Sequence, residues 1–187
     1  MSLFMKKKIA VLFPGIGYTC DRPLLYYAGK IAALKGYKLI KVEYSDFSSG
    51  IKGNEKKMEE AFQCGLKQAE KFLGDICWDE YEDILFISKS IGTAISAAFA
   101  REHQLQVKNI LFTPLRQTFL FADRESIVFH GTADPWADTK DIIKGCEKLN
   151  LPLILTEKGD HSLETGEILK DLENLEKVMT QVNEFIK

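Results

Sequence analysis

Short apolar runs rich in β-branched residues alternate along this chain with segments of helical periodicity, and this alternation limits the fold more than any other feature. The runs are apolar throughout, as in Ile9-Ala-Val-Leu-Phe13, rather than at every second residue. Strands of a parallel sheet have this pattern because helices cover both faces. The alternation therefore predicts an α/β three-layer sandwich, a parallel sheet whose crossovers are right-handed.

Six strands and five helices use up nearly all of the 187 residues, so residues 1–187 are expected to form a single domain. The predicted strands are 8–13, 37–44, 83–88, 107–113, 126–130 and 151–156. The first two predicted helices run from the expected caps Asp21 and Asn54 to about residues 35 and 73, and the others are 91–102, 138–149 and 167–186. Asp21 is the expected N-cap of the first helix, and Gly36 follows its end. The last helix is amphipathic, with a predicted buried stripe of Ile168, Leu172, Leu175, Met179, Val182 and Ile186.

Composition excludes several classes of protein. Lys and Arg number 25 against 27 Asp and Glu, a net charge of −2, which leaves no surplus of cations for a nucleic-acid surface. The apolar runs are far shorter than the ~20 residues of a membrane helix. The four cysteines are widely spaced with no Cys-x-x-Cys pair, so reduced thiols are expected and neither a metal nor another cofactor is predicted.

The start of the chain predicts a cytoplasmic protein. We interpret residues 1–4 as additions ahead of a native start at Met5, which Lys6-Lys7-Lys8 follows. Three lysines also begin many signal peptides, but the apolar stretch behind these has only five residues and stops at Pro14-Gly15. A solvated charge cluster ahead of the first strand is therefore the preferred interpretation.

Ser90, Asp134 and His161 each follow a separate predicted strand, where ligands bind in open α/β sheets. Ser90 lies on the tight strand-to-helix link Ser88-Lys-Ser-Ile-Gly92, beside a helix N-terminus that favours developing negative charge. Asp134 can accept a hydrogen bond from an imidazole, and His161 lies in a loop that contains Gly159. Taken singly, each residue also fits a structural role. Ser90 could lie in an ordinary polar turn, Asp134 could cap the turn before Pro135, and His161 could be a loop histidine without a catalytic role.

The chain order Ser, Asp, His is that of the α/β-hydrolase triad. With these residues in this order, the sequence resembles the α/β-hydrolase superfamily from Lys8 to Lys187, and it looks closest to small lidless members of the dienelactone-hydrolase-like kind. The resemblance implies a six-stranded sheet of order 2-1-3-4-5-6. Gly92 fits the family's Gly-x-Ser-x-Gly pattern, whereas Ser88 departs from it.

The resemblance also implies a serine hydrolase that cleaves a small carboxylic ester or thioester through an acyl-enzyme on Ser90. His161, oriented by Asp134, would take the proton from Ser90. The oxyanion would be stabilised by the backbone N–H of Ile91 and that of Ile16, with Gly17 as the second choice. A proline, Pro14, replaces the histidine that often begins this oxyanion loop.

The substrate is expected to be a small molecule that contacts Tyr18, Arg116 and Trp136, although packing or surface roles also suit each of these residues. Arg116 would favour an acidic or phosphorylated substrate. Only residues 114–125 join the fourth and fifth strands, where larger family members insert a lid, so an open site is expected. No nucleic-acid or membrane partner is predicted, and the chain is a monomer or a homodimer.

Two other functions stay open at this point. Because of the departures at Ser88 and Pro14, the chain could be a catalytically inactive binding or scaffold protein with the same fold. Alternatively, Gly15-Ile-Gly17 could cradle a phosphate in a flavodoxin-like nucleotide binder, although Cys20 occupies the place of the third glycine of that pattern.

Overall fold

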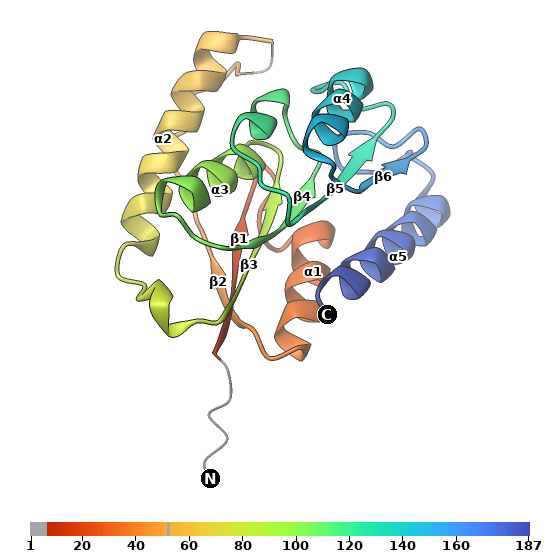
Figure 1. The fold of residues 1–187 in the computed structure, drawn as a ribbon. Coiled ribbons are helices and arrows are strands. Elements are labelled where there is room, and N and C mark those ends of the chain that lie inside the picture. Colours follow the sequence, from red (N-terminus) through yellow and green to blue (C-terminus); the bar gives the residue numbers. More distant parts are fainter. Residues whose placement is uncertain (1–6, 52) are drawn as a thin grey trace.

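A computed structural model describes residues 7–51 and 53–187, which form a six-stranded parallel sheet between two layers of helices (Figure 1). The strands are β1 (Lys8–Phe13), β2 (Lys38–Lys41), β3 (Asp83–Lys89), β4 (Lys108–Phe112), β5 (Ser126–Gly131) and β6 (Leu153–Thr156). The helices are α1 (Pro23–Leu34), α2 (Glu55–Leu73), α3 (Ile91–Glu102), α4 (Thr139–Leu149) and α5 (Ile168–Phe185), with short 3-10 helices η1 (Trp78–Glu80) and η2 (Arg116–Leu120).

The strand order is β2-β1-β3-β4-β5-β6 with every neighbouring pair parallel, which confirms the predicted α/β sandwich and its order. The interpretation of residues 1–4 lies outside the described residues. Within the residues described, no helix is long and apolar enough to cross a membrane.

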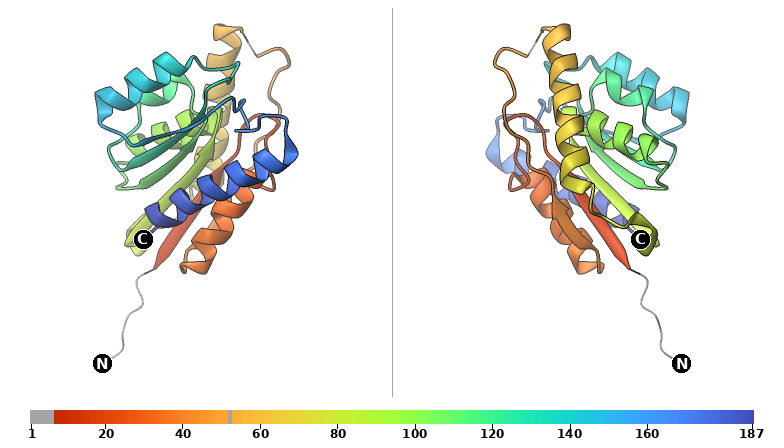
Figure 2. Two further views of the ribbon diagram at one scale, coloured as in Figure 1. Left: turned by 90° about the vertical axis from the view of Figure 1, so that its right-hand side faces the viewer. Right: turned by 90° about the vertical axis from the view of Figure 1, so that its left-hand side faces the viewer.

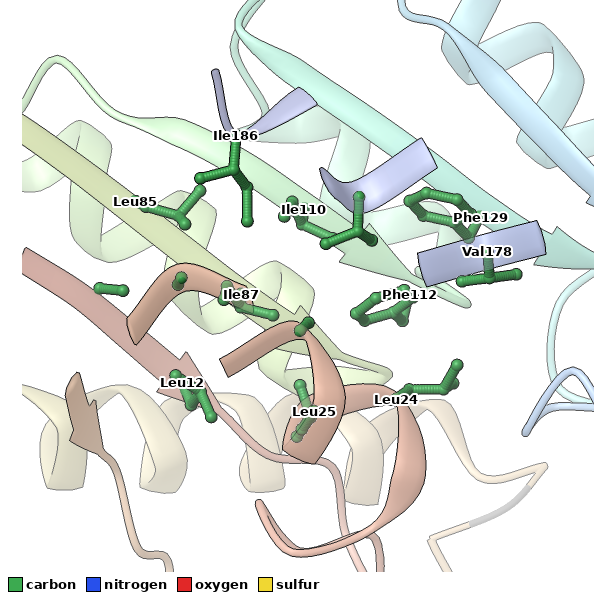
Figure 3. Close-up of a cluster of buried hydrophobic side chains, with 14 of the residues drawn as sticks. Leu12, Leu24, Leu25, Leu85, Ile87, Ile110, Phe112, Phe129, Val178 and Ile186 are labelled. Carbon is green, nitrogen blue, oxygen red and sulfur yellow. The ribbon is translucent and has the colours of Figure 1, made fainter. Parts of the chain in front are cut away.

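The central strands are mostly apolar because their two faces meet different helices. In β1, Ala10 and Leu12 belong to the core under α1 and α5, while Ile9, Val11 and Phe13 belong to the core under α2 and α3. The side views in Figure 2 show α1 and α5 on one side of the sheet and α2 and α3 on the other. Figure 3 shows the first of these cores, where leucine, isoleucine and phenylalanine side chains from β1, β3, β4 and β5 meet those from α1 and α5.

The two edge strands are shorter than predicted. β2 covers Lys38–Lys41 of the predicted 37–44, and β6 covers Leu153–Thr156 of the predicted 151–156. Each pairs with one neighbour only, β2 with β1 and β6 with β5, so fewer hydrogen bonds extend these strands.

The prediction that Asp21 caps the first helix is wrong. Arg22 is the N-cap of α1 without a side-chain hydrogen bond, and the Asp21 carboxylate instead lies 2.6 Å from the Lys41 ammonium of β2. Gly36 follows the helix end with a φ of 87°, as predicted, and this left-handed conformation favours glycine.

The predicted buried stripe of α5 is correct only in its second half. Val182 and Ile186 are buried, but Ile168 is 78% exposed and Leu172 is 57% exposed. The helix packs on the sheet and α1 only from about Leu175 onwards, so its first two turns project past the core. Periodicity identifies the apolar face of a helix, and it carries no information on where along that face the partner begins.

This difference between the two ends of α5 predicts unequal effects for the same substitution. Ile186→Ala removes a buried side chain and should lower the free energy of unfolding by about 2–4 kcal/mol. Ile168→Ala, the matched control in the exposed first turn, should change it by less than about 0.5 kcal/mol. Urea denaturation followed by circular dichroism measures both values, and equal losses would contradict this packing.

Candidate active site

Ser90 occupies a strained turn between β3 and α3. Its backbone has a φ of 57° and a ψ of −126°, which a non-glycine residue adopts at a cost of about 1–3 kcal/mol. Hydrogen bonds hold the turn: the Ser90 N–H donates to the Phe112 carbonyl at 3.0 Å, and the Ser90 carbonyl accepts from the Thr93 N–H at 2.9 Å. The turn holds the Ser90 hydroxyl at the carboxyl edge of the sheet beside the N-terminus of α3.

The residues two places before and two places after Ser90, Ser88 and Gly92, show why the turn tolerates one departure from the Gly-x-Ser-x-Gly pattern. A Cβ on Gly92 would overlap the carbonyl oxygens of Phe13 and Pro14, so only glycine fits there. Ser88 is fully buried, and its hydroxyl donates to the Ile110 carbonyl at 3.3 Å. A buried hydroxyl with an acceptor costs little, so Ser88 is accommodated.

The three predicted catalytic side chains form one hydrogen-bonded chain. His161 Nε2 lies 2.7 Å from Ser90 Oγ, and His161 Nδ1 lies 2.7 Å from Asp134 Oδ2. A neutral imidazole satisfies both contacts when Nδ1–H donates to the carboxylate and Nε2 accepts from the hydroxyl. The second Asp134 oxygen accepts from the Trp136 N–H at 2.8 Å, which fixes the carboxylate.

Backbone packing brings the Asp134 and His161 loops together. A Cβ on Gly131 would overlap the carbonyl oxygens of Gly159 and Asp160, so the end of β5 lies directly against the loop after β6. Thr113, at the end of β4, donates its hydroxyl to the His161 carbonyl at 3.0 Å. His161 is thus held from β4 and β5 as well as by its own loop.

Burial and charge together keep His161 neutral. Burial lowers the pKa of His161 below its usual 6.5, the Asp134 hydrogen bond opposes this shift, and the positive charge of Lys89 adds to it. Burial raises the pKa of Asp134, but the hydrogen bond from His161 outweighs it with the help of the Trp136 N–H, so the carboxyl stays ionised. A neutral imidazole on an ionised carboxylate is the state in which His161 can accept a proton.

Backbone N–H groups from two segments, one at the start of α3 and one after β1, belong to residues that line the same cavity as Ser90. Ile91 is the first residue of α3, where an N–H has no partner within the helix. Gly15 passes so close to Ser90 that a Cβ there would lie 3.1 Å from the serine Cβ, and Ile16 follows it. Within residues 7–51 and 53–187, the N–H groups of Ile16 and Gly17 donate to no backbone carbonyl.

A cavity of about 320 Å³ opens at Ser90 and His161. It is lined by Ile16, Gly17, Tyr18, Arg22, Met58, Lys89, Ser90, Ile91, Pro135, Trp136, Asp160, His161 and Ser162. Of the predicted substrate contacts, Tyr18 and Trp136 line it, and the Trp136 ring stacks on the His161 ring with centroids 5.5 Å apart. Arg116 does not line it, because the turn of η2 leaves its side chain exposed elsewhere.

Several lining residues were absent from the sequence predictions. Arg22 follows the β1 loop and Met58 comes from α2, which no spacing rule connects to Ser90. Lys89 had a signal that was overlooked, since it directly precedes the candidate nucleophile at the end of a buried strand. No group of three or more His, Cys, Asp or Glu side chains suited to a metal ion occurs in the described part of the chain.

Solved structures with the same fold are numerous but distant in sequence. A lidless α/β serine hydrolase from Xanthomonas campestris matches with a TM-score of 0.62 and 13% identity, covering 99% of this chain and 84% of the other. The esterase Est1E from Butyrivibrio proteoclasticus, solved with ferulic acid bound, matches with a TM-score of 0.68 and 13% identity over 96% of this chain and 88% of Est1E.

A third structure, an α/β serine hydrolase homologue from Coxiella burnetii, has a TM-score of 0.58 and 16% identity over 96% of this chain and 87% of the other. No protein-family model and no curated protein matches the sequence. At these identities the likeness establishes the fold, and the chemistry must be argued from the residues themselves.

The crowding at Gly92 predicts a large effect of one added methyl group. Gly92→Ala should lower the free energy of unfolding by about 3 kcal/mol, because the new Cβ has to displace backbone rather than a flexible side chain. Gly36→Ala is the control: its Cβ meets no atom within 4 Å, so only the left-handed backbone costs about 1 kcal/mol. Equal losses in thermal or urea unfolding would contradict the close approach at Gly92.

For a hydrolase in which His161 is the general base, the lowered pKa of His161 predicts activity that persists into mildly acidic solution. A general base acts in its neutral form, so kcat/KM for an ester falls as the pH drops through the His161 pKa. Because that pKa lies below 6.5, the acidic limb should have its midpoint below pH 6.5. Initial rates of 4-nitrophenyl acetate hydrolysis between pH 4.5 and 8 measure it, and a midpoint above 6.5 would refute the assignment.

Proposed function

We propose that this chain, which has the α/β-hydrolase fold, is a serine hydrolase that cleaves small carboxylic esters or thioesters. The observation that carries the proposal is the continuous chain of hydrogen bonds from Ser90 through His161 to the buried Asp134, with 2.7 Å at each of the two links. A nucleophile within reach of a base that a third group orients is the arrangement that serine hydrolysis requires.

The reaction then follows from the protonation states. Neutral His161 takes the proton of Ser90 Oγ as that oxygen attacks the substrate carbonyl, and Asp134 stabilises the resulting imidazolium. His161 next gives the proton to the leaving alcohol or thiol, which leaves an acyl group on Ser90. Water activated by His161 releases the acid and restores the serine.

The negative charge of each tetrahedral intermediate falls beside the N-terminus of α3. We assign the two oxyanion donors to the backbone N–H groups of Ile91 and Ile16, which have no backbone acceptor of their own among the described residues. Donors of this kind contribute about 3–4 kcal/mol each to transition-state stabilisation. Because both are backbone groups, the proline at Pro14 does not remove a donor.

The size and surroundings of the cavity indicate a small substrate. Its volume of about 320 Å³ is at the lower end of the range of small-molecule sites. The link between β4 and β5 contains only the short helix η2 and forms no lid, as in the lidless X. campestris hydrolase. Short acyl groups therefore suit the site better than long chains.

The strained backbone at Ser90 favours catalysis over the alternative of an inactive scaffold. A binding protein gains nothing from a serine held at a φ of 57° against a histidine and a buried carboxylate. A phosphate cradle at Gly15–Gly17 would need that loop for a ligand, whereas here it lies directly against Ser90.

A fluorophosphonate probe tests the proposal. It should label the folded wild-type protein at Ser90, and Ser90→Ala should abolish labelling and lower kcat for a short 4-nitrophenyl ester by about 10⁶-fold. Asp134→Asn should lower kcat by about 10⁴-fold, because the amide no longer favours the required imidazole tautomer. Ser126→Ala, at the opposite end of the sheet, is the control and should keep both activities. Absence of labelling in the folded wild-type protein would overturn the proposal.

A further inference from the structure

Lys89 occupies a position on β3 at which the other side chains of the same row are apolar. It ends β3 in the same row as Leu85 and Ile87, whose side chains lie in the core under α1 and α5. Lys89 is only 1% exposed, and its ammonium lies over the Tyr18 ring, 4.9 Å from the centroid. Lys89 and Tyr18 both line the cavity at Ser90, so the buried side chain reaches the site.

The ammonium of Lys89 has no anionic partner in the described part of the chain. No carboxylate oxygen there lies within 4.0 Å of it, and it donates no hydrogen bond. The two nearby carboxylates have other hydrogen-bond partners: Asp134 accepts from His161 and Trp136, and Asp160, which also lines the cavity, accepts through Oδ1 from the N–H groups of Ser162 and Glu164. Buried lysines are almost always paired, and an isolated buried charge is strongly unfavourable.

A second cation lines the same cavity. Arg22 lies just before α1, and its guanidinium is 5.9 Å from the centroid of the Tyr18 ring. The Tyr18 hydroxyl accepts a hydrogen bond from the Leu24 N–H at 3.1 Å, which holds the ring in place. Lys89 and Arg22 are therefore both positioned about one fixed aromatic ring at the edge of the cavity.

We propose that Lys89, assisted by Arg22, binds a negatively charged group of the substrate, so that the preferred substrate is an ester or thioester that also carries a carboxylate or phosphate. This inference rests on the proposed hydrolase function and adds the substrate class. The cavity is small, so the anionic group has to lie within a few bonds of the scissile carbonyl. Lys89 thus takes the role that the sequence suggested for Arg116, which lies outside the cavity.

A bound anion would also change the charge state of the lysine. Burial lowers the pKa of Lys89 to about 7, and Asp134 and Asp160 oppose that shift. A bound anion raises this pKa and keeps the lysine charged. The charged or titratable groups that face Lys89 come from the loops after β1, β5 and β6: Tyr18, Arg22, Asp134, Asp160 and His161.

The test compares monoethyl glutarate with ethyl 5-methylhexanoate, in which an isopropyl group replaces the carboxylate. The wild-type protein should hydrolyse the anionic ester with a kcat/KM about tenfold higher or more, as expected for a charge-assisted contact. Lys89→Met should lower the ratio of the two kcat/KM values by about tenfold, and Arg22→Gln should lower it less because Arg22 is exposed. Lys108→Met, at the other end of the sheet, is the matched control and should keep the wild-type ratio.

The pH dependence of this ratio separates charge recognition from a structural role. His161 affects both esters equally, so its titration cancels in the ratio. The wild-type ratio should fall between pH 6 and pH 8.5 as Lys89 loses its proton, and in Lys89→Met it should be flat. A Lys89→Met variant that lowers both activities equally, with a flat wild-type ratio, would overturn the proposal.

Binding without turnover keeps this test independent of the hydrolase function. Calorimetry with Ser90→Ala should detect glutarate, inorganic phosphate or both, which identifies the anion, and Lys89→Met in the same background should abolish the signal. If neither ester is hydrolysed but glutarate or phosphate binds through Lys89, the anion site stands and the proposed function fails. If the neutral ester is hydrolysed and neither anion binds or is preferred, the anion site fails alone.

Discussion

The active-site geometry depends on two places where backbone passes against backbone with no room for a Cβ. At Gly92 the first turn of α3 packs directly against the carbonyl oxygens of Phe13 and Pro14, at the end of β1. This contact brings the loop with Ile16 beside Ser90. At Gly131 the end of β5 packs directly against backbone carbonyls of the loop after β6. This contact brings Asp134 beside His161. The three proposed catalytic side chains come from distant parts of the sequence, so these close approaches help to set the distances between them.

Electrostatics at the site follows from the same packing. Asp134 is buried yet ionised because His161 and the Trp136 N–H donate to it, and His161 is neutral because burial outweighs that carboxylate. The positive charge of Lys89 disfavours the protonation of His161 further. A mobile or solvated arrangement of these residues would leave each near its ordinary pKa, so the proposed proton transfer requires the closely packed sheet edge.

The apolar runs allowed the parallel sheet to be predicted, and chain order singled out the three candidate residues at its edge, because both reflect constraints along the backbone. The strand order came from the family resemblance. The sequence did not show which side chains meet a partner in the folded protein. Asp21 has the residue type of an N-cap, but its carboxylate is paired with Lys41, and Ile168 has the periodicity of a core residue although α5 has not yet reached the core there. Arg116 follows a strand as expected, yet the turn of η2 decides that its side chain is exposed elsewhere. These outcomes depend on tertiary packing, which residue type and spacing do not encode.

Lys89 was overlooked because a lysine beside a turn usually lies at the surface, whereas here the alternation of β3 directs it into the core. Its place on a central strand matters for recognition. Hydrogen bonds to β1 and β4 hold β3 on both sides, so the sheet fixes the place of Lys89, and Ser90 follows it directly in the chain. Arg22 and Trp136 lie outside the helices and strands, where sequence change is better tolerated. Preference for an anionic group would therefore persist while the loops vary, leaving the rest of the substrate to be selected by the residues around Tyr18 and Trp136.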